Sequence, residues 1–379
     1  MREVAGHFTL LYEPISDQAI AGRLAACRPW VEALLPQMLG PRDLARLERC
    51  GRLLVIDGSQ VQGPGARGSQ YRLHVALDLV SLQFVQIRVT DKRTGESLAN
   101  FALGRGDVAL VDRGYAHPDK MVQTVQQGVH LILRLNAHNV PVYGLDGARL
   151  DLAERLQAQP AETIHSLPVV VKTADGQQAI QGWLHAYRLN EQQANQARRR
   201  ARRNNRKKRR TPKAETLFLA GWVLVWTTLP PEQLSAQQSL DLYRLRWQVE
   251  VAIKRWKSLL DVGQLRAREG SPLAELWLHG KLLYALMLEK RMRRKLGDRW
   301  GRLDQQRTAS WWRPWKLLRD EIAPLIAPAL FWSEPVWQSC LKVLAERPRE
   351  RKLQRLPDEV LQLLDRLPAP LTLPLTEAA

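Results

Sequence analysis

Hydrophobic residues in the first third of the chain fall into short runs and alternations that predict a β-sheet. Residues 53–56 and 108–111 are continuous apolar runs, which is typical of strands buried on both faces. Residues 71–79 and 82–90 alternate apolar and polar positions, which predicts an antiparallel hairpin. Residues 130–135 add a fifth strand.

Apolar residues at helical spacing lie on both sides of these strands. They predict helices over 14–50, interrupted at Pro36 and at Gly40-Pro41. Further helices are predicted from Pro118 to about Gln127, over 239–260 and over 273–294. The tail after residue 300, rich in Trp and Pro, is also expected to be helical.

The segment 136–238 has a different character and is interpreted as a β-rich insertion. It holds three strand-like pieces, over 166–172, 180–189 and 217–228. The patterning as a whole predicts an α/β fold, a mixed sheet flanked by helices. We expect this unit to be built from residues 51–135 and 239–300, with helical segments over 1–50 and 301–379.

The charge of the chain is strongly unbalanced: 57 Lys and Arg stand against 38 Asp and Glu, a net charge of +19. Such an excess implies a polyanionic partner, and without a lipidation signal or a basic amphipathic terminus we favour nucleic acid. One run inside the insertion is especially dense and has too few hydrophobic residues to bury itself, so we expect it to be mobile and to contact DNA. It comprises Arg198, Arg199, Arg200, Arg202, Arg203, Arg206, Lys207, Lys208, Arg209 and Arg210.

The sequence also bears on the compartment. No apolar run reaches the ~18 residues of a membrane span, and the first residues lack the pattern of a signal peptide. The three cysteines are scattered and show no CxxC spacing, which indicates reduced thiols and no zinc site. We therefore expect a cytoplasmic protein.

Two aspartates stand at the ends of predicted strands. Asp57 follows the run 53–56 and Asp112 follows 108–111. Open α/β sheets place their ligands at such strand ends, so the two carboxylates are candidates for one site. Aspartate is also common in turns and helix caps, and this alternative stays open.

The predicted helix over 239–260 presents a polar stripe. At ~100° per residue, Tyr243, Arg246, Glu250 and Lys257 project within ~60° of one another, with Trp247 at the border. The apolar residues collect on a separate arc, so the stripe is turned away from the core-facing side. Arg246 and Glu250 also have the spacing of an ordinary i,i+4 ion pair.

These residues resemble a known family. The spacing of Tyr243, Arg246, Glu250 and Lys257 is similar to the YREK signature of IS4-family transposases, and IDGSQ and VDRGY resemble the first two aspartate blocks of that family. The resemblance runs from about residue 50 to about residue 295. It implies an RNase H-like catalytic domain, a catalytic and metal-binding triad of Asp57, Asp112 and Glu250, and cut-and-paste movement of DNA through a hairpinned transposon end.

The chemistry of these residues agrees with the resemblance. Cleavage of a phosphodiester by two metal ions ~3.5–4 Å apart needs carboxylates to hold the ions, and Mg²⁺ prefers oxygen ligands. We expect two Mg²⁺ ions per site, with Mn²⁺ as a substitute. Arg246 would contact a DNA phosphate through its guanidinium, Tyr243 through its hydroxyl and Lys257 through its charge.

The family resemblance further implies a base flipped onto a tryptophan during hairpin formation. Of the 13 tryptophans, Trp222 and Trp247 are the candidates, with Trp226 as an alternative to Trp222. A core or strand-pairing role is the competing interpretation of Trp222.

The resemblance also sets expectations about partners. Family members carry a larger helical domain ahead of the first aspartate, whereas 56 residues precede Asp57 here, so residues 1–50 are expected to be a shortened end-recognition segment. The expected partners are double-stranded DNA at terminal inverted repeats, target DNA and a second subunit paired through residues 301–379. Two alternatives stay open: a DNA-binding relative without catalysis that acts as an inhibitor, and a structure-selective nuclease on the same fold.

Overall fold

The computed structural model describes residues 15–40, 51–207, 209–296 and 312–322, with Ala5 and two short paired strands, β9 (Thr308–Ala309) and β10 (Ala345–Glu346). Most of the predicted segment 301–379 therefore lies outside the described residues. No helix among those described is both long and apolar enough to cross a membrane.

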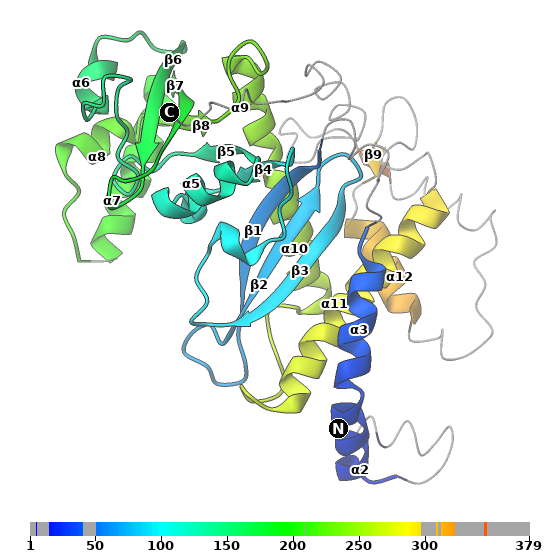
Figure 1. Ribbon diagram of the computed structural model, residues 1–379. Helices are drawn as coiled ribbons and strands as arrows, with labels where there is room; N and C mark the ends of the chain where they lie inside the picture. The colour runs from blue at the N-terminus through cyan, green and yellow to red at the C-terminus, as the bar shows by residue number, and fades with distance from the viewer. Residues whose placement is uncertain are drawn as a thin grey trace.

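One eight-stranded sheet organises the described part of the chain (Figure 1). Its strands are β1 (Leu53–Val61), β2 (Tyr71–Asp78), β3 (Gln83–Asp91), β4 (Val108–Val111), β5 (His130–Arg134), β6 (Ile164–Lys172), β7 (Ala179–Arg188) and β8 (Trp222–Thr227). Their order is β3-β2-β1-β4-β5-β8-β7-β6. The pairs β1–β4 and β4–β5 are parallel and the others antiparallel, which confirms the predicted mixed sheet.

The insertion extends this sheet. β8 pairs with β5, and β7 and β6 follow outward from β8. The approach of β7 to β8 is close, because a Cβ at Gly182 would lie 2.6 Å from the Trp226 ring. The three strand-like pieces of the sequence are thus confirmed as strands, except that residues 217–219 belong to a short helix, α8 (Ala214–Leu219), and the strand starts only at Trp222.

Helices cover both faces of the sheet. Alternate residues of a strand point to opposite faces, so Val55 and Leu110 join one core and Ile56 and Ala109 the other. The first core is completed by α9 (Ala236–Leu245), α10 (Trp247–Leu260) and α11 (Pro272–Leu296). The second is covered by α5 (Pro118–Gln126) and by two shorter elements, η1 (Leu98–Asn100) and α6 (Leu152–Gln157).

The predicted helix 239–260 is two helices in succession. α9 starts three residues earlier than predicted, behind a capping box of Ser235 and Gln238, and ends at Leu245. Arg246 joins it to α10 with helical backbone angles, but its N–H bonds to the Tyr243 carbonyl, one residue closer than in an α-helix. The helical backbone is therefore wound more tightly at Arg246, one member of the polar stripe.

The basic run proved to be helical over most of its length. α7 (Glu191–Lys207) carries it up to Lys207, and a buried Ala194 faces inward while the charged side chains project outward. Up to Lys207 the run therefore has regular structure, and the helix that carries it contacts α8. Lys208 lies outside the described residues.

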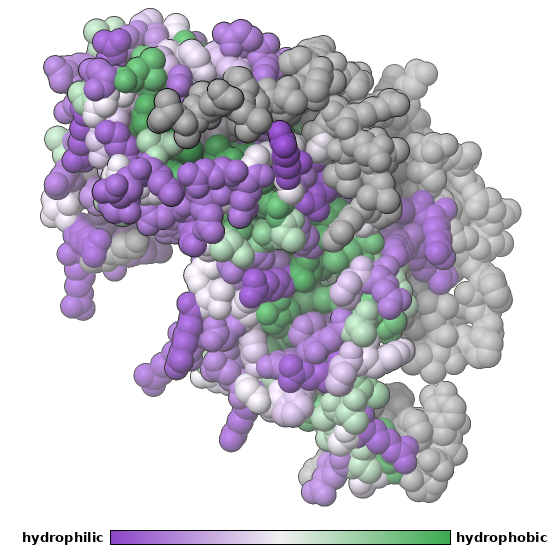
Figure 2. All heavy atoms as spheres, in the orientation of Figure 1, coloured by the Kyte–Doolittle hydropathy of each residue, from purple (hydrophilic) through white to green (hydrophobic). Residues whose placement is uncertain are grey.

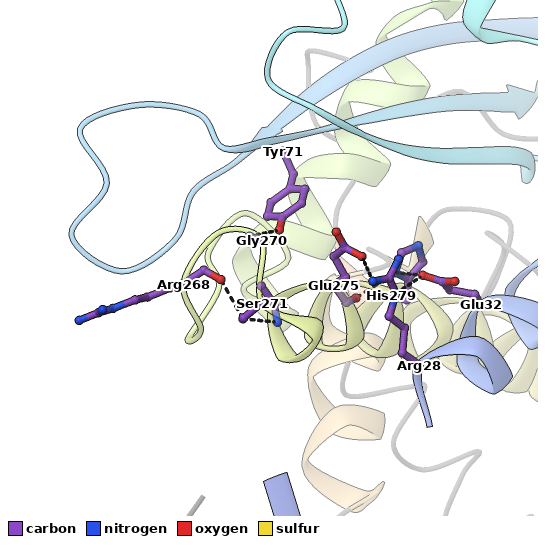
Figure 3. A network of polar contacts seen from close by, with 9 residues as sticks. Arg28, Glu32, Tyr71, Arg268, Gly270, Ser271, Glu275 and His279 are labelled. Carbon is purple, nitrogen blue, oxygen red and sulfur yellow. Dashed lines mark hydrogen bonds and ion pairs between the residues drawn. The ribbon is translucent and has the colours of Figure 1, made fainter. Parts of the chain in front are cut away.

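The N-terminal helices pack onto α11. They are α2 (Asp17–Ala26) and α3 (Arg28–Met38). The sequence predicted an interruption at Pro36, but Pro36 lies inside the last turn of α3 and the helix continues to Met38. Figure 3 shows how the two segments are tied: Arg28 of α3 pairs with Glu275 of α11, and Glu32 lies 3.7 Å from the ring of His279. Residues 41–50 are outside the described part, so this predicted helical stretch is described only up to residue 40.

Candidate active site

The register of β1 and β4 brings two aspartates level with each other. The last parallel pair is Val55 with Leu110, and Asp57 and Asp112 each follow two residues later. By the alternation of the strands both side chains belong to the sheet face covered by α9 and α10. Contrary to the prediction, Asp57 does not end its strand: β1 continues to Val61, paired only with β2.

The polar stripe of α9 and α10 meets these aspartates. The Tyr243 hydroxyl donates a hydrogen bond of 3.1 Å to Asp112 Oδ1. The Arg246 guanidinium hydrogen-bonds Glu250 Oε1 and lies 3.9 Å from Asp57 Oδ2. Residues of three segments that are far apart in the sequence, namely β1, the loop after β4 and the helix pair, therefore meet in one polar centre.

Burial and charge pull the two aspartates in opposite directions. The pKa of Asp57 is raised to about 6, mainly by burial. The hydrogen bond from the Gly58 N–H and the charge of Arg246 lower this pKa, and the nearby charges of Glu250 and Asp112 raise it. Burial acts in the same way on Asp112, but Arg246, Arg113 and the Tyr243 hydroxyl outweigh it, so the pKa of Asp112 is lowered. The two carboxylates thus differ in their affinity for protons.

Arg246 is the counter-charge of the centre. Its side chain is only 12% exposed. Burial alone would lower its pKa, but Tyr243, Asp112 and Glu250 reverse this and the pKa is raised. The guanidinium is held firmly in its charged form.

Lys257 lies at the edge of this centre. Burial lowers the pKa of its ammonium group, and the charge of Asp57 opposes that effect. Its aliphatic chain packs against Gly263, where a Cβ would lie 3.3 Å from three of its carbons. All four members of the stripe therefore face the same region.

The donor set suits a hard divalent cation, since Asp57, Asp112 and Glu250 offer only carboxylate oxygens. In the described part of the chain, however, no three acidic, His or Cys side chains are spaced to hold a metal ion. Arg246 takes up Glu250 and approaches Asp57. Glu250 would have to leave this guanidinium to join Asp57 and Asp112 around a cation.

Trp222 lines a cavity of about 450 Å³ beside this centre. Arg113 and Arg134 form part of its wall, and residues at the end of α7 and the start of α8 form another part. Trp222 itself is 3% exposed and packs into the second core, with the Arg188 guanidinium 5.9 Å from its ring. It is thus a core residue that also borders a cavity, and almost none of its ring surface is exposed.

The other two tryptophans differ from Trp222. Trp226 is fully buried in the sheet and is not among the residues that line the cavity. Trp247 is half-buried and carries the Lys254 ammonium group 4.0 Å from its ring. Neither presents a free ring face to the cavity in the described structure.

The charged side chains of the basic run form an exposed surface on the insertion. Figure 2 shows hydrophilic residues over the region of α7 and α8. Arg198 is half-buried and pairs with Glu191 at 3.1 Å. The rest of the described run is exposed: Arg199, Arg200, Arg202, Arg203, Arg206, Lys207, Arg209 and Arg210.

Sequence reasoning missed Arg134 near the centre. Arg134 ends β5 and lies close enough to Arg113, Tyr243 and Asp112 for their charges to act on it. Its position at the end of a buried strand, like that of Asp112 just after β4, was the available signal.

The sheet order, the helices on both faces and the acidic centre on the neighbouring strands β1 and β4 are consistent with the RNase H-like fold of DDE transposases. Residues 48–286 match the family described as "Transposase DDE domain", and the chain belongs to that family.

Individual relatives agree with this match. The chain is 32% identical to the putative transposase InsL for insertion sequence element IS186A of Escherichia coli K12. The aligned region of 280 residues covers 73% of this chain and 75% of that protein. The transposase for insertion sequence element IS421 of Escherichia coli is similar to the same extent. The transposase for IS231F of Bacillus thuringiensis subsp. israelensis is 29% identical over 251 residues, 61% of this chain and 52% of that protein.

Proposed function

We propose that this protein is the transposase of an insertion sequence and that it moves DNA by cut-and-paste, through strand cleavage, hairpin formation and strand transfer. The observation that carries the proposal is the convergence of Asp57, Asp112 and Glu250 on the Arg246 guanidinium, on the face of the sheet that α9 and α10 cover. Membership of the DDE transposase family supports it.

In this proposal Asp57, Asp112 and Glu250 hold divalent cations, two Mg²⁺ or, as a substitute, Mn²⁺. When bound, such ions activate the attacking oxygen and stabilise the leaving oxygen of a phosphodiester. The protein prepares the site beforehand, because the Tyr243 hydroxyl fixes Asp112, and Asp57 and Glu250 keep only 19% and 23% exposure.

Arg246 has two roles here. In the free protein it neutralises Glu250 and Asp57, which would otherwise repel each other. A DNA phosphate is also a bidentate acceptor for a guanidinium, so bound DNA competes for Arg246 and releases Glu250 toward the cations. Lys257 adds a positive charge on the same side of the helix pair.

The surrounding surface suits the DNA. The cavity beside Trp222, with Arg113 and Arg134 in its wall, is large enough to receive a displaced base, and we assign the hairpin step to it. Trp247 stays a weaker candidate because Lys254 covers its ring. The exposed cations of α7 would follow the phosphates of the flanking duplex, and a second subunit would complete the synaptic complex.

The test compares the wild type with Glu250→Gln on a linear DNA that carries the terminal repeats of the element, with Mg²⁺ or with EDTA. We expect Mg²⁺-dependent release of hairpinned ends by the wild type, and loss of that cleavage with nearly unchanged DNA binding in Glu250→Gln. Glu232→Gln, an exposed residue between β8 and α9, is the matched control.

Retained cleavage in Glu250→Gln would exclude this glutamate from the catalytic set. Tight binding without cleavage by the wild type would instead favour a DNA-binding relative without catalysis. Cleavage of branched DNA regardless of the terminal repeats would favour a structure-selective nuclease.

A further inference from the structure

A second arginine lies beside the acidic centre, on the strand next to Asp112. Arg134 ends β5, and the register pairs Val111 of β4 with Leu133 of β5, so Arg134 is level with Asp112. By the alternation of the strands, both side chains belong to the sheet face that α9 and α10 cover. Arg134 also forms part of the wall of the cavity beside Trp222, so it connects this cavity with the acidic centre.

The guanidinium of Arg134 has no direct partner in the described part of the chain. The side chain is half-buried, yet it makes no hydrogen bond or ion pair with a described residue. Burial lowers its pKa, and the charges of Arg113 and Arg246 lower it as well, while Tyr243 and Asp112 oppose this without outweighing it. A partly buried cation that is not neutralised costs free energy, which a bound anion would offset.

Arg246 shows what a direct partner changes at the same centre. Its guanidinium hydrogen-bonds Glu250, and its pKa is raised although the group is buried. The two arginines act on the same aspartate, Asp112, but only Arg246 is paired with a carboxylate of the described chain. Arg134 is therefore the arginine of this centre that lacks an anion.

The cavity that Arg134 borders is basic. Among the described residues that line it, one is acidic, Glu215, and four carry a positive charge: Arg113, Arg134, Arg210 and Lys213. Such a wall favours an anionic ligand over a neutral one. The fork of a guanidinium matches the oxygens of a phosphate group, and phosphates are the anions of DNA.

We infer that Arg134, with Arg113 beside it, binds a backbone phosphate of the DNA strand that the neighbouring carboxylates cleave. This inference rests on the proposed function, because the strand is the one that the acidic centre acts on. Arg246 would hold the strand at the carboxylates, and Arg134 would hold it at the cavity. Arg134 lies outside the motifs on which the family resemblance depends, so it adds a DNA-binding residue to Tyr243, Arg246 and Lys257.

The experiment replaces single phosphates of the DNA by neutral methylphosphonates. Duplexes that end in the terminal repeat of the element carry one methylphosphonate each, at successive positions near the cleavage point, and their affinity for the full chain is measured by fluorescence anisotropy in EDTA. We expect one position to weaken binding by the wild type by about 10- to 100-fold, the usual effect of losing hydrogen bonds to a charged group. At that position Arg134→Gln should lose little further affinity, because the partner of the phosphate is already absent.

Arg149→Gln is the matched control. It removes the same charge from an exposed residue of the insertion that does not line the cavity. This variant should stay as sensitive to the methylphosphonate as the wild type. If Arg134→Gln is also as sensitive as the wild type at every position, or if no position affects the wild type, Arg134 does not hold a phosphate and the inference fails.

The measurement separates this inference from the proposed function, since binding in EDTA does not require cleavage. Mg²⁺-dependent cleavage of the unmodified duplex without any coupling between Arg134 and a phosphate would refute the inference alone. Coupling without cleavage in Mg²⁺ would refute the proposed function and leave the phosphate site in place.

A stability measurement separates a DNA-binding residue from a structural one. Because Arg134 has no direct partner among the described residues, Arg134→Gln should resist urea at least as well as the wild type when DNA is absent. Added duplex should stabilise the wild type more than the variant, because the wild type binds it more tightly. A variant that is less stable than the wild type without DNA would assign Arg134 a structural role and overturn the inference.

Discussion

Replacing Asp57 by Asn should stabilise the cation-free protein at neutral pH. The pKa of Asp57 is raised from an ordinary 3.8 to about 6, mainly by burial. A carboxyl group with a raised pKa contributes its full stability below pH 3.8, and that contribution is lost as the pH rises through about 6. Above that range the folded protein holds a buried charge that the unfolded chain would hold in water.

The size of the effect follows from the two pKa values. One pKa unit corresponds to about 1.4 kcal/mol, so the difference sets an upper bound of about 3 kcal/mol at pH 7.5. The side chain keeps 19% exposure, so solvent screening reduces the penalty of the charge. We therefore expect Asp57→Asn to raise the free energy of unfolding by about 1–3 kcal/mol at pH 7.5 and by much less at pH 4.5. Asn keeps the oxygen that accepts the Gly58 N–H, so this hydrogen bond is not lost.

Urea unfolding of both proteins at the two pH values, in EDTA, measures the difference. Asp146→Asn is the matched control, because Asp146 is exposed and also accepts a backbone hydrogen bond, from the Ala148 N–H. Added Mg²⁺ should stabilise the wild type and leave Asp57→Asn unchanged, since a ligand of the folded state stabilises only the protein that binds it. A variant no more stable than the wild type at pH 7.5 in EDTA would refute the reasoning about burial.

Two further predictions concern parts of the molecule away from the carboxylates. Replacing Arg199, Arg202 and Arg206 on α7 by Gln should weaken the salt dependence of DNA binding. The slope of the log binding constant against log salt concentration should fall by up to about 3, because each phosphate contact contributes about 0.9. An unchanged slope in a filter-binding series would show that these side chains do not contact DNA. Glu289→Gln should lower the free energy of unfolding, measured with urea, by about 3–5 kcal/mol. Glu289 is buried between Arg255, 3.9 Å away, and the Trp256 indole N–H, so the substitution leaves the buried Arg255 charge without its counter-charge. A loss below about 1 kcal/mol would show that the ion pair contributes little to stability.

The sheet could be predicted from the sequence because its strands are short, apolar and regularly spaced. The runs at 53–56 and 108–111 lie within confirmed strands, and the hairpin over 71–90 differs only at its ends. The strand 217–228 was placed too early because Leu217, Phe218 and Leu219 are as apolar as a strand, while their helical contacts depend on α7, a partner that the pattern does not reveal. The helix that carries the basic run was missed for a similar reason. The composition of the run shows its charges, whereas the contacts of α7 with α8 cannot be seen in it.

The candidate site was less predictable than the fold. The stripe of Tyr243, Arg246, Glu250 and Lys257 could be derived from angles around one predicted helix, since its members recur at helical spacing. Its meeting with Asp57 and Asp112 could not, because no local period links a helix to the strands on which it packs. Such contacts are fixed only when α9 and α10 pack on the sheet.

The pair of Arg246 and Glu250 shows most clearly what spacing alone leaves undecided. On an exposed helix an i,i+4 pair contributes a few tenths of a kcal/mol, and nothing in the sequence distinguishes this pair from such a one. In the structure the Arg246 side chain is 12% exposed and reaches Asp57 on another element as well as Glu250 on its own. An ion pair in this setting costs desolvation that one partner alone would not offset. At Arg246, Tyr243, Asp112 and Glu250 together outweigh the desolvation of the guanidinium, so the positive charge is stable there without a bound cation.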